Sequence, residues 1–269
     1  MASEGVSRYG VLQQSEAVTE VDIALEELAL LGFATLDSGF TPESMSDLSR
    51  RFEEARSRYP TITAPFDAEP DVIRVLPYLD DVFFKVLFNE RLHELLGGVL
   101  GEYYIVNQVN GLINPAGSTD YSQAPWHRDL PFRHLTMSRP IAVNALFALD
   151  DFTIDNGCTS VLPGSHKVEN FCSDEVVLRN ARPITARAGT FILLDCMTYH
   201  RGGINRSAGD RRAINHVFTI PAWRQQLHLP SIFGDSVDLS AAQKKVLGYG
   251  LEEFRSHADW FANLKAKSG

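Results

Sequence analysis

The middle of this chain is a succession of short apolar or alternating segments, which Gly, Pro, Asn and Asp separate from residue 103 onward. Segments of this length, bounded by turn-forming residues, are typical of β-strands. We expect strands near residues 103–113, 123–129, 140–150, 158–162, 184–187, 190–195 and 212–220, and a short one before them over 33–36. So many short strands in sequence predict a double-sheet barrel or jelly roll.

Segments with helical spacing of apolar residues flank this β region. Residues 20–31 form the first, and Gly32 follows at the position where a helix favours glycine. Pro42 begins a second expected helix that extends to about Tyr59. Further helices are expected over residues 82–100 and 240–266. The predicted fold class is therefore mainly β with flanking helices.

The length and composition of the chain favour a single domain. A chain of 269 residues with 44% hydrophobic residues can bury a large core, and β domains of roughly 200–250 residues often fold as one unit. Residues 1–19 are polar and aperiodic, which indicates a mobile tail. We expect one domain over residues 20–269, with N-terminal helices, a β core over about 101–222 and a C-terminal helix over about 240–266 that packs outside the barrel.

Charge, cysteine content and hydropathy disfavour several classes of partner. The formal net charge of -9 argues against nucleic acid, whose phosphates need clustered Lys and Arg. The 3 cysteines lack C-x-x-C spacing and are too few for a disulfide framework, which indicates a reducing cytoplasm. No basic start precedes an apolar run at the N-terminus, and no segment reaches the roughly 20 apolar residues of a membrane span. We therefore expect neither nucleic acid nor a membrane as partner.

The motif His127-x-Asp129 is the first candidate for chemistry. On a strand, side chains two positions apart project from the same face, so these two residues can hold one ion. Two His and one carboxylate form a facial triad that leaves coordination positions open on iron. His200, just beyond an apolar strand, is the best candidate for the third ligand. The motif His257-x-Asp259 has the same spacing but lies in a helical segment, where positions i and i+2 diverge.

Two adjacent arginines, Arg211 and Arg212, open the last expected strand after His200. A cosubstrate with two carboxyl groups chelates the metal at one end and needs a cation at the other. A guanidinium binds a carboxylate through two hydrogen bonds, so one of these arginines can serve. Neighbours on a strand face opposite ways, and only one of the two can therefore enter the pocket.

Several further motifs accompany these residues along the chain. They are Asn205-x-Ser207, Asp155-Asn156-Gly157-Cys158, Pro163-Gly164-Ser165-His166, the helix end Gly32-Phe33 and Ala148-Leu149-Asp150-Asp151. Together with the metal motif and Arg211, this set resembles the phytanoyl-CoA hydroxylase (PhyH-like) family of oxygenases over roughly residues 20–225. The resemblance implies a double-stranded β-helix enzyme that uses Fe(II), 2-oxoglutarate and O2 and releases succinate and CO2.

The resemblance also implies roles for single residues. His127, Asp129 and His200 match the metal ligands, and Arg211, rather than Arg212, matches the 2-oxoglutarate clamp. Polar residues on facing strands that can support the cosubstrate are Gln108, Asn144 and Thr159. Halogenating relatives lack the carboxylate ligand. Because this chain keeps Asp129, we expect hydroxylation, desaturation, epoxidation or ring rearrangement of a small-molecule substrate, in specialised metabolism.

Other residues and other functions stay open. Trp126 and Phe132 flank the metal motif and are candidates to contact substrate, although aromatic residues in a barrel belong to the core by default. His166 is expected to be a structural turn residue, and the histidines without a partner at ligand spacing are His134, His216 and His228. The alternatives are a cupin-like metalloenzyme without cosubstrate and a jelly-roll module that binds sugars or lipids without catalysis. The C-terminal helix could serve a homodimer interface.

Overall fold

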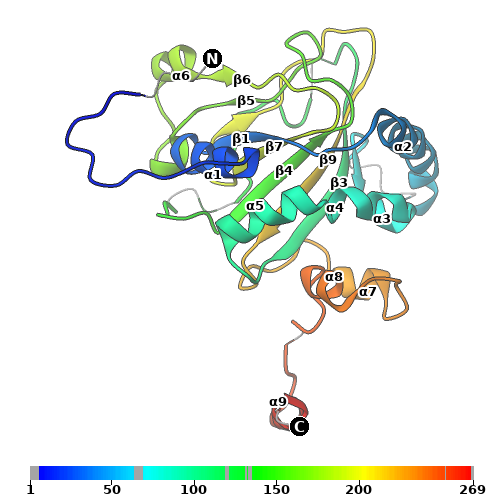
Figure 1. The fold of residues 1–269 in the computed structure, drawn as a ribbon. Coiled ribbons are helices and arrows are strands. Elements are labelled where there is room, and N and C mark those ends of the chain that lie inside the picture. The colour runs from blue at the N-terminus through cyan, green and yellow to red at the C-terminus, as the bar shows by residue number, and fades with distance from the viewer. Residues whose placement is uncertain are drawn as a thin grey trace.

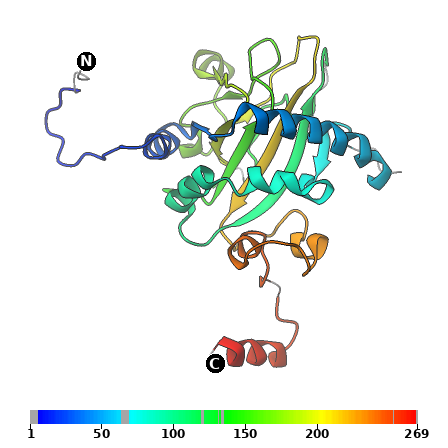
Figure 2. The same ribbon diagram turned by 45° about the vertical axis from the view of Figure 1, so that its right-hand side comes forward.

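Two antiparallel sheets face each other, and helices cover the outer face of the larger one (Figures 1 and 2). The computed structural model describes residues 6–63, 69–118, 121–130, 132, 135–251 and 253–267. The larger sheet has the strand order β1-β7-β4-β9-β3-β2, and the smaller has the order β6-β5-β8. Apart from the pairs β2–β3 and β5–β6, strands that follow one another in the chain are not neighbours in a sheet, which is the arrangement of a jelly roll.

Most of the expected strands are present. The larger sheet contains β1 (Phe33–Asp37), β2 (Val72–Arg74), β3 (Ile105–Asn114), β4 (Ala142–Ala148), β7 (Thr190–Asp195) and β9 (Arg211–Thr219). The smaller contains β5 (Ser160–Val161), β6 (Arg182–Pro183) and β8 (His200–Arg201). The strand expected over 184–187 is wrong, because β6 pairs with β5 two residues earlier and Ala186 makes only an isolated bridge to Phe152. Strands β2 and β8 were not expected.

The strand expected over residues 123–129 is also wrong. Only His127 pairs, in an isolated bridge to His200. Pro125 has no N–H to contribute to a strand ladder, and the Asp129 N–H donates instead to the carbonyl of Cys196 at 3.1 Å. The segment is therefore an extended loop that follows the edge of the smaller sheet.

The first two helices begin and end where local sequence favours it. Helix α1 (Glu20–Leu31) starts at a capping box on Thr19 and ends at Gly32, whose φ of 81° is left-handed. Helix α2 (Pro42–Thr63) begins at its proline. The helices that follow are α3 (Leu76–Leu79), η1 (Asp81–Phe83), α4 (Phe84–Leu87), α5 (Glu90–Leu100) and α6 (Asp174–Asn180).

The single helix expected over 82–100 is wrong, because η1, α4 and α5 divide it. Asn89 has an extended backbone (φ -62°, ψ 127°), and its side chain accepts a hydrogen bond from the N–H of Leu92. A residue in this conformation caps a new helix instead of continuing the preceding one. Helical spacing of apolar residues persists across the break, which is why periodicity alone did not reveal it.

The C-terminal region contains α7 (Leu229–Phe233), α8 (Ala241–Val246) and α9 (His257–Lys267). The single helix expected over 240–266 is wrong, because Gly248 and Gly250 have left-handed φ values of 90° and 81° and end it. Helix α9 lies apart from the sheets (Figures 1 and 2), with Trp260 and Phe261 exposed. Among the described residues, no helix is long and apolar enough to cross a membrane.

The two faces of the larger sheet have different neighbours, because side chains alternate along each strand. Phe147 and Phe191 lie on the outer face, within a core that also contains Leu28 of α1 and Phe52 of α2. The inner face carries a second, smaller cluster that joins the two sheets and contains Leu146, Ala148, Val161, Leu194 and Ala213. The helices thus cover the outer face of the larger sheet, and the polar residues between the sheets lie on its inner face.

Candidate active site

His127, Asp129 and His200 bring three potential ligand atoms within 4.8 Å of one another. The backbones of the two histidines exchange hydrogen bonds of 2.9 and 3.0 Å, and their ring centroids lie 4.4 Å apart. A loop that is hydrogen-bonded to β8, rather than a regular strand, therefore places His127 and Asp129 beside His200. The other motif with this spacing, His257-x-Asp259, lies in helix α9 as expected.

A backbone carbonyl orients each imidazole. Nδ1 of His127 lies 2.9 Å from the carbonyl oxygen of Pro125, and Nδ1 of His200 lies 3.0 Å from that of Thr198. Because a carbonyl oxygen only accepts, Nδ1 of both rings carries a proton, and Nε2 is the atom available to a metal. Nε2 of His200 lies 3.5 Å from Oδ1 of Asp129.

The charges of these three side chains are coupled. Burial raises the pKa of Asp129, but the charge and hydrogen bond of His200, with smaller contributions from Asn144 and His127, outweigh burial and lower it. Burial lowers the pKa of His200, but Asp129 outweighs burial and raises it. Burial, and then the charge of His200, lower the pKa of His127. A divalent cation at this point would compensate the charge of Asp129 and would bind the two imidazoles in their neutral form.

Asn144, on β4, orients the carboxylate of Asp129. Its Nδ2 donates to Oδ2 of Asp129 at 2.9 Å, while Oδ1 of Asp129 faces His200. One carboxylate oxygen is thus held by the protein and the other points to the two imidazoles. Asn144 was expected to support the cosubstrate; its observed contact is with the carboxylate of Asp129, a candidate metal ligand, although it also lines the cavity described next.

A cavity, here called the inner cavity, connects the three candidate ligands to Arg211. Its polar lining includes Tyr121, Thr159 and Asn215. Thr159 lies where it was expected, whereas Tyr121 and Asn215 were missed, because neither belongs to a motif and only the fold brings them to this point. The apolar lining comes mostly from the inner face of the larger sheet and comprises Leu112, Leu146, Leu194 and Ala213.

Arg211 is a buried cation, only 4% exposed, that faces the inner cavity. Its guanidinium lies 4.0 Å from the centroid of the Phe152 ring, and its Nε has no hydrogen-bond partner in the described part of the chain. Burial lowers the pKa of Arg211, and the neighbouring Tyr121 partly opposes that effect. A buried charge is costly unless an anion compensates it, so this position is suited to a carboxylate from outside the protein.

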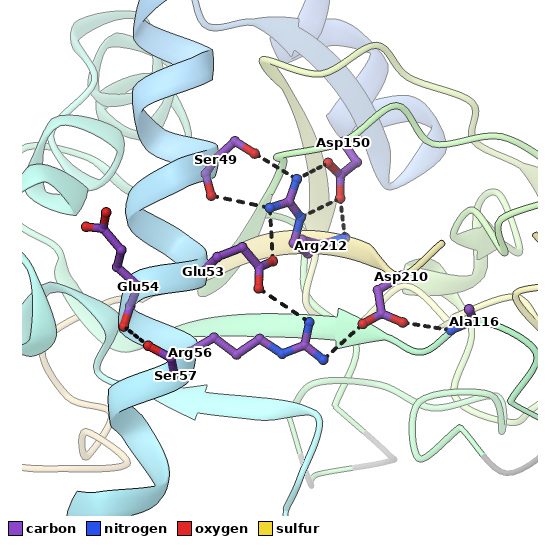
Figure 3. Close-up of polar contacts among 9 residues, drawn as sticks. All are labelled: Ser49, Glu53, Glu54, Arg56, Ser57, Ala116, Asp150, Asp210 and Arg212. Atoms are coloured by element: carbon purple, nitrogen blue, oxygen red, sulfur yellow. Dashed lines mark hydrogen bonds and ion pairs between the residues drawn. The ribbon is translucent and has the colours of Figure 1, made fainter. Parts of the chain in front are cut away.

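Arg212 points to the opposite face of the sheet (Figure 3). Its guanidinium donates to both carboxylate oxygens of Asp150, at 2.6 and 2.9 Å, and to Glu53 and Ser49 of α2 at 3.0 and 2.8 Å. Asp210 is likewise held, by Arg56 of α2 at 2.9 Å. These contacts anchor the start of β9 to α2 on either side of Arg211, which is the arginine of the pair that lines the cavity.

The remaining candidates lie elsewhere. Gln108 lines a second, larger cavity beside the inner one, here called the outer cavity. Trp126 packs against Phe171, and Phe132 packs edge-to-face against Trp223; neither lines these two cavities. Of the other histidines, His166 is buried near the carbonyl of Ala29, His216 is buried beside that of Ala145, and His228 contacts Ser231. His134 lies outside the described residues.

Residues 30–213, more than half of the chain, match the family model for phytanoyl-CoA dioxygenase (PhyH). The chain belongs to this family. An uncharacterised protein of Mycobacterium tuberculosis is 31% identical over 242 residues, which are 86% of this chain and 88% of that protein. An iron/alpha-ketoglutarate-dependent dioxygenase of Penicillium thymicola is 30% identical over 138 residues, which are 48% of this chain and 42% of that enzyme.

Two solved structures show the same fold as this PhyH-family chain. AviO1 from Streptomyces viridochromogenes aligns with a TM-score of 0.59 and 21% identity, over 77% of this chain and 98% of its own. EctD from S. alaskensis, solved with 2-oxoglutarate and 5-hydroxyectoine, aligns with a TM-score of 0.62 and 21% identity, over 75% and 77%. The expected jelly-roll fold is confirmed.

Family membership also confirms the expected enzyme class. The chain is an iron- and 2-oxoglutarate-dependent oxygenase of the PhyH family. The roles of its individual residues stay predictions.

Proposed function

We propose that His127, Asp129 and His200 hold Fe(II), that Arg211 binds the distal carboxylate of 2-oxoglutarate, and that the enzyme oxidises a C–H bond of a small molecule. Hydroxylation balances as substrate C–H, 2-oxoglutarate and O2 giving substrate C–OH, succinate and CO2. The observation that carries the proposal is Arg211, a buried cation that shares a cavity with the three ligand side chains.

The donor set fits iron. One nitrogen of each imidazole and one carboxylate oxygen lie within 4.8 Å of one another, which is the donor set of the facial triad of Fe(II) oxygenases, and all three residues line the inner cavity. Iron bound there would supply the activation of O2. The retained carboxylate of Asp129 supports oxygenation rather than halogenation, because the position that a halide would take is already filled.

The residues around the ligands keep this geometry. The carbonyls of Pro125 and Thr198 hold Nδ1 of the two imidazoles, and Asn144 holds one oxygen of Asp129, so each ligand presents one atom. Arg211 would orient 2-oxoglutarate by its distal carboxylate and leave the 2-oxo acid end toward the metal. Thr159 and Tyr121 line the path between the two ends.

Metal and cosubstrate binding can be tested under argon. Fe(II) and 2-oxoglutarate together should produce a weak metal-to-ligand absorption band, and Asp129→Ala should lose it. Asp259→Ala, which changes the acid of the helical His-x-Asp motif, is the matched control and should retain it. Absence of the band in the wild-type protein refutes the proposal. If His200→Ala abolishes turnover while Arg211→Ala leaves it intact, Arg211 does not bind 2-oxoglutarate.

Location, partners and domain organisation remain part of the proposal. We propose a cytoplasmic enzyme acting on a small molecule without nucleic acid or membrane as partner, and the three free cysteines support a reducing location. The exposed apolar side chains of α9 support a homodimer as the assembly. A tail over residues 1–19 and one domain over 20–269 stay predictions; residues 6–18 form neither helix nor strand.

A further inference from the structure

The outer cavity has an unusually polar wall for a ligand site. Its volume is about 540 Å³, and Pro70, Val72 and Leu112 are its only purely apolar lining residues among those described. Ligand sites of this size are mostly lined by hydrophobic side chains. Here the wall contains one carboxylate and five carboxamides that are not metal ligands or ion-paired, namely Asp71, Gln108, Asn110, Gln123, Asn215 and Gln226.

The strands place three of these carboxamides in a row. Gln108 and Asn110 are two positions apart on β3, and Asn110 pairs directly with Asn215 on β9. Residues two and four apart on a strand share a face, so Asn215 lies on the same face as Arg211. Asn215 also lines both cavities, which places it at their junction. The row is therefore held by the rigid sheet and leads toward the metal ligands.

The cations near this wall are engaged within the protein. Arg74 pairs with Glu69 and donates to Oε1 of Gln226 at 3.0 Å. The guanidinium of Arg128 donates to the backbone carbonyls of Met197 and Ser165, at 2.7 and 2.8 Å.

Asp71, by contrast, adds negative charge to the wall. Burial, and then the charge of Asp210, raise the pKa of Asp71. Arg56 lowers the pKa of Asp71, but its ion pair is with Asp210. An anionic substrate would thus meet a carboxylate and arginines that already have partners.

The carboxamides retain hydrogen-bonding capacity. A carboxamide has two N–H donors and an acceptor oxygen. Asn110 donates to the oxygen of Gln108 at 3.0 Å and accepts from the N–H of Val75 at 3.4 Å, whereas the two N–H donors of Gln108 have no partner among the described residues. Oδ1 of Asn215 is buried and has no partner within the described ranges. An apolar substrate would leave these groups unsatisfied, which disfavours its binding. A hydroxyl both donates and accepts, and it therefore matches a carboxamide in either orientation.

We infer that the substrate is a neutral, polyhydroxylated small molecule, such as a glycosyl unit or a polyol, bound by the carboxamides of β3 and β9 and by Asp71. The inference rests on the proposed function, because it names the occupant of the cavity beside the metal ligands. A fatty acyl thioester and a phosphorylated sugar are the competing classes.

The class can be tested with the anaerobic Fe(II)–2-oxoglutarate complex. Neutral probes are methyl α-glucoside, sucrose, myo-inositol and uridine; competing probes are octanoyl-coenzyme A and glucose 6-phosphate. We expect at least one neutral probe at millimolar concentration to shift the absorption band and to stimulate succinate release in air severalfold. Response to a competing probe alone, or to no neutral probe, overturns the inference while the band persists. Absence of the band refutes the proposed function and this inference with it.

A variant then links the response to the wall. Gln108→Leu removes the carboxamide with little change in size, and we expect it to raise the KM for the responding probe at least tenfold. The dissociation constant of 2-oxoglutarate should not change, since Gln108 does not line the inner cavity. Gln14→Leu, in an exposed segment outside any helix or strand, is the matched control. An unchanged KM in Gln108→Leu also overturns the inference.

Discussion

Replacing Arg211 by methionine removes a buried positive charge whose Nε has no hydrogen-bond partner among the described residues. Replacing the adjacent Arg212 by methionine removes a charge that Asp150 and Glu53 do neutralise. The two substitutions change the same side chain at neighbouring positions of one strand. Their consequences should differ, because the proposed partner of Arg211 is the cosubstrate and the partners of Arg212 belong to the protein.

The expected magnitudes follow from these contacts. Loss of one partner of a buried, hydrogen-bonded charge pair costs about 2–5 kcal/mol of binding free energy, so Arg211→Met should weaken 2-oxoglutarate binding roughly a hundredfold. Its free energy of unfolding without ligands should not fall, since an uncompensated buried charge is removed. Arg212, 15% exposed, loses its ion pairs, so Arg212→Met should lower the free energy of unfolding by about 2 kcal/mol and the Tm by roughly 5 °C.

Two measurements separate the variants. Anaerobic titration of the Fe(II) protein with 2-oxoglutarate gives the dissociation constant, and calorimetry of the metal-free protein gives the Tm. We expect Arg211→Met to change the first and Arg212→Met the second. If Arg211→Met lowers the Tm as much as Arg212→Met does and binds 2-oxoglutarate within threefold of wild type, the assignment of Arg211 to the cosubstrate is wrong.

Three further predictions concern the fold and the ligand geometry. Burial lowers the pKa of His216 to about 4, whereas an unfolded histidine titrates near about 6.5, so the unfolded state takes up the proton first as pH falls. The free energy of unfolding should therefore fall by about 3 kcal/mol more in wild type than in His216→Phe between about pH 6.5 and 4; equal losses in urea titrations contradict this. Alanine at Gly157 would place Cβ 2.4 Å from the carbonyl oxygen of Gly203, whereas alanine at Gly164, with a similar left-handed φ, meets nothing within 4 Å. Gly164→Ala should cost about 1 kcal/mol and Gly157→Ala clearly more in thermal unfolding, and equal costs would rule out the steric explanation. Asn144→Leu should weaken Fe(II) binding roughly tenfold by freeing Asp129, so an unchanged affinity would assign Asn144 another role.

The positions of the strands and helices show which elements local sequence patterns predict and which they miss. Strands β3, β4, β7 and β9 were expected within two residues of their observed ends, because alternating and apolar runs depend only on neighbouring positions. The breaks at Asn89 and Gly248, and the loop at Pro125, were not expected, because a cap or a missing N–H interrupts a segment without changing its hydrophobic pattern.

The candidate ligands followed from residue chemistry and spacing. Few other His, Asp or Arg residues lie near the expected strand ends. The resemblance to the PhyH family then implied which of them bind the metal and which binds the cosubstrate, namely His127, Asp129, His200 and Arg211. Trp126 and Phe132 were chosen by proximity in sequence, and they lie outside both cavity linings, since a side chain next to a ligand can face the other way.

By itself, the sequence determined the family, the mainly β fold and a short list of candidate metal-binding residues, all of which depend on side-chain chemistry and local periodicity. Only the tertiary structure decided which arginine lines the cavity, that Asn144 holds Asp129, and that β3 and β9 line up a row of carboxamides beside the candidate metal ligands. These features depend on strand register and on contacts between residues that are far apart in the chain. No local pattern encodes either, because both arise from the packing of the two sheets and α2 as a whole.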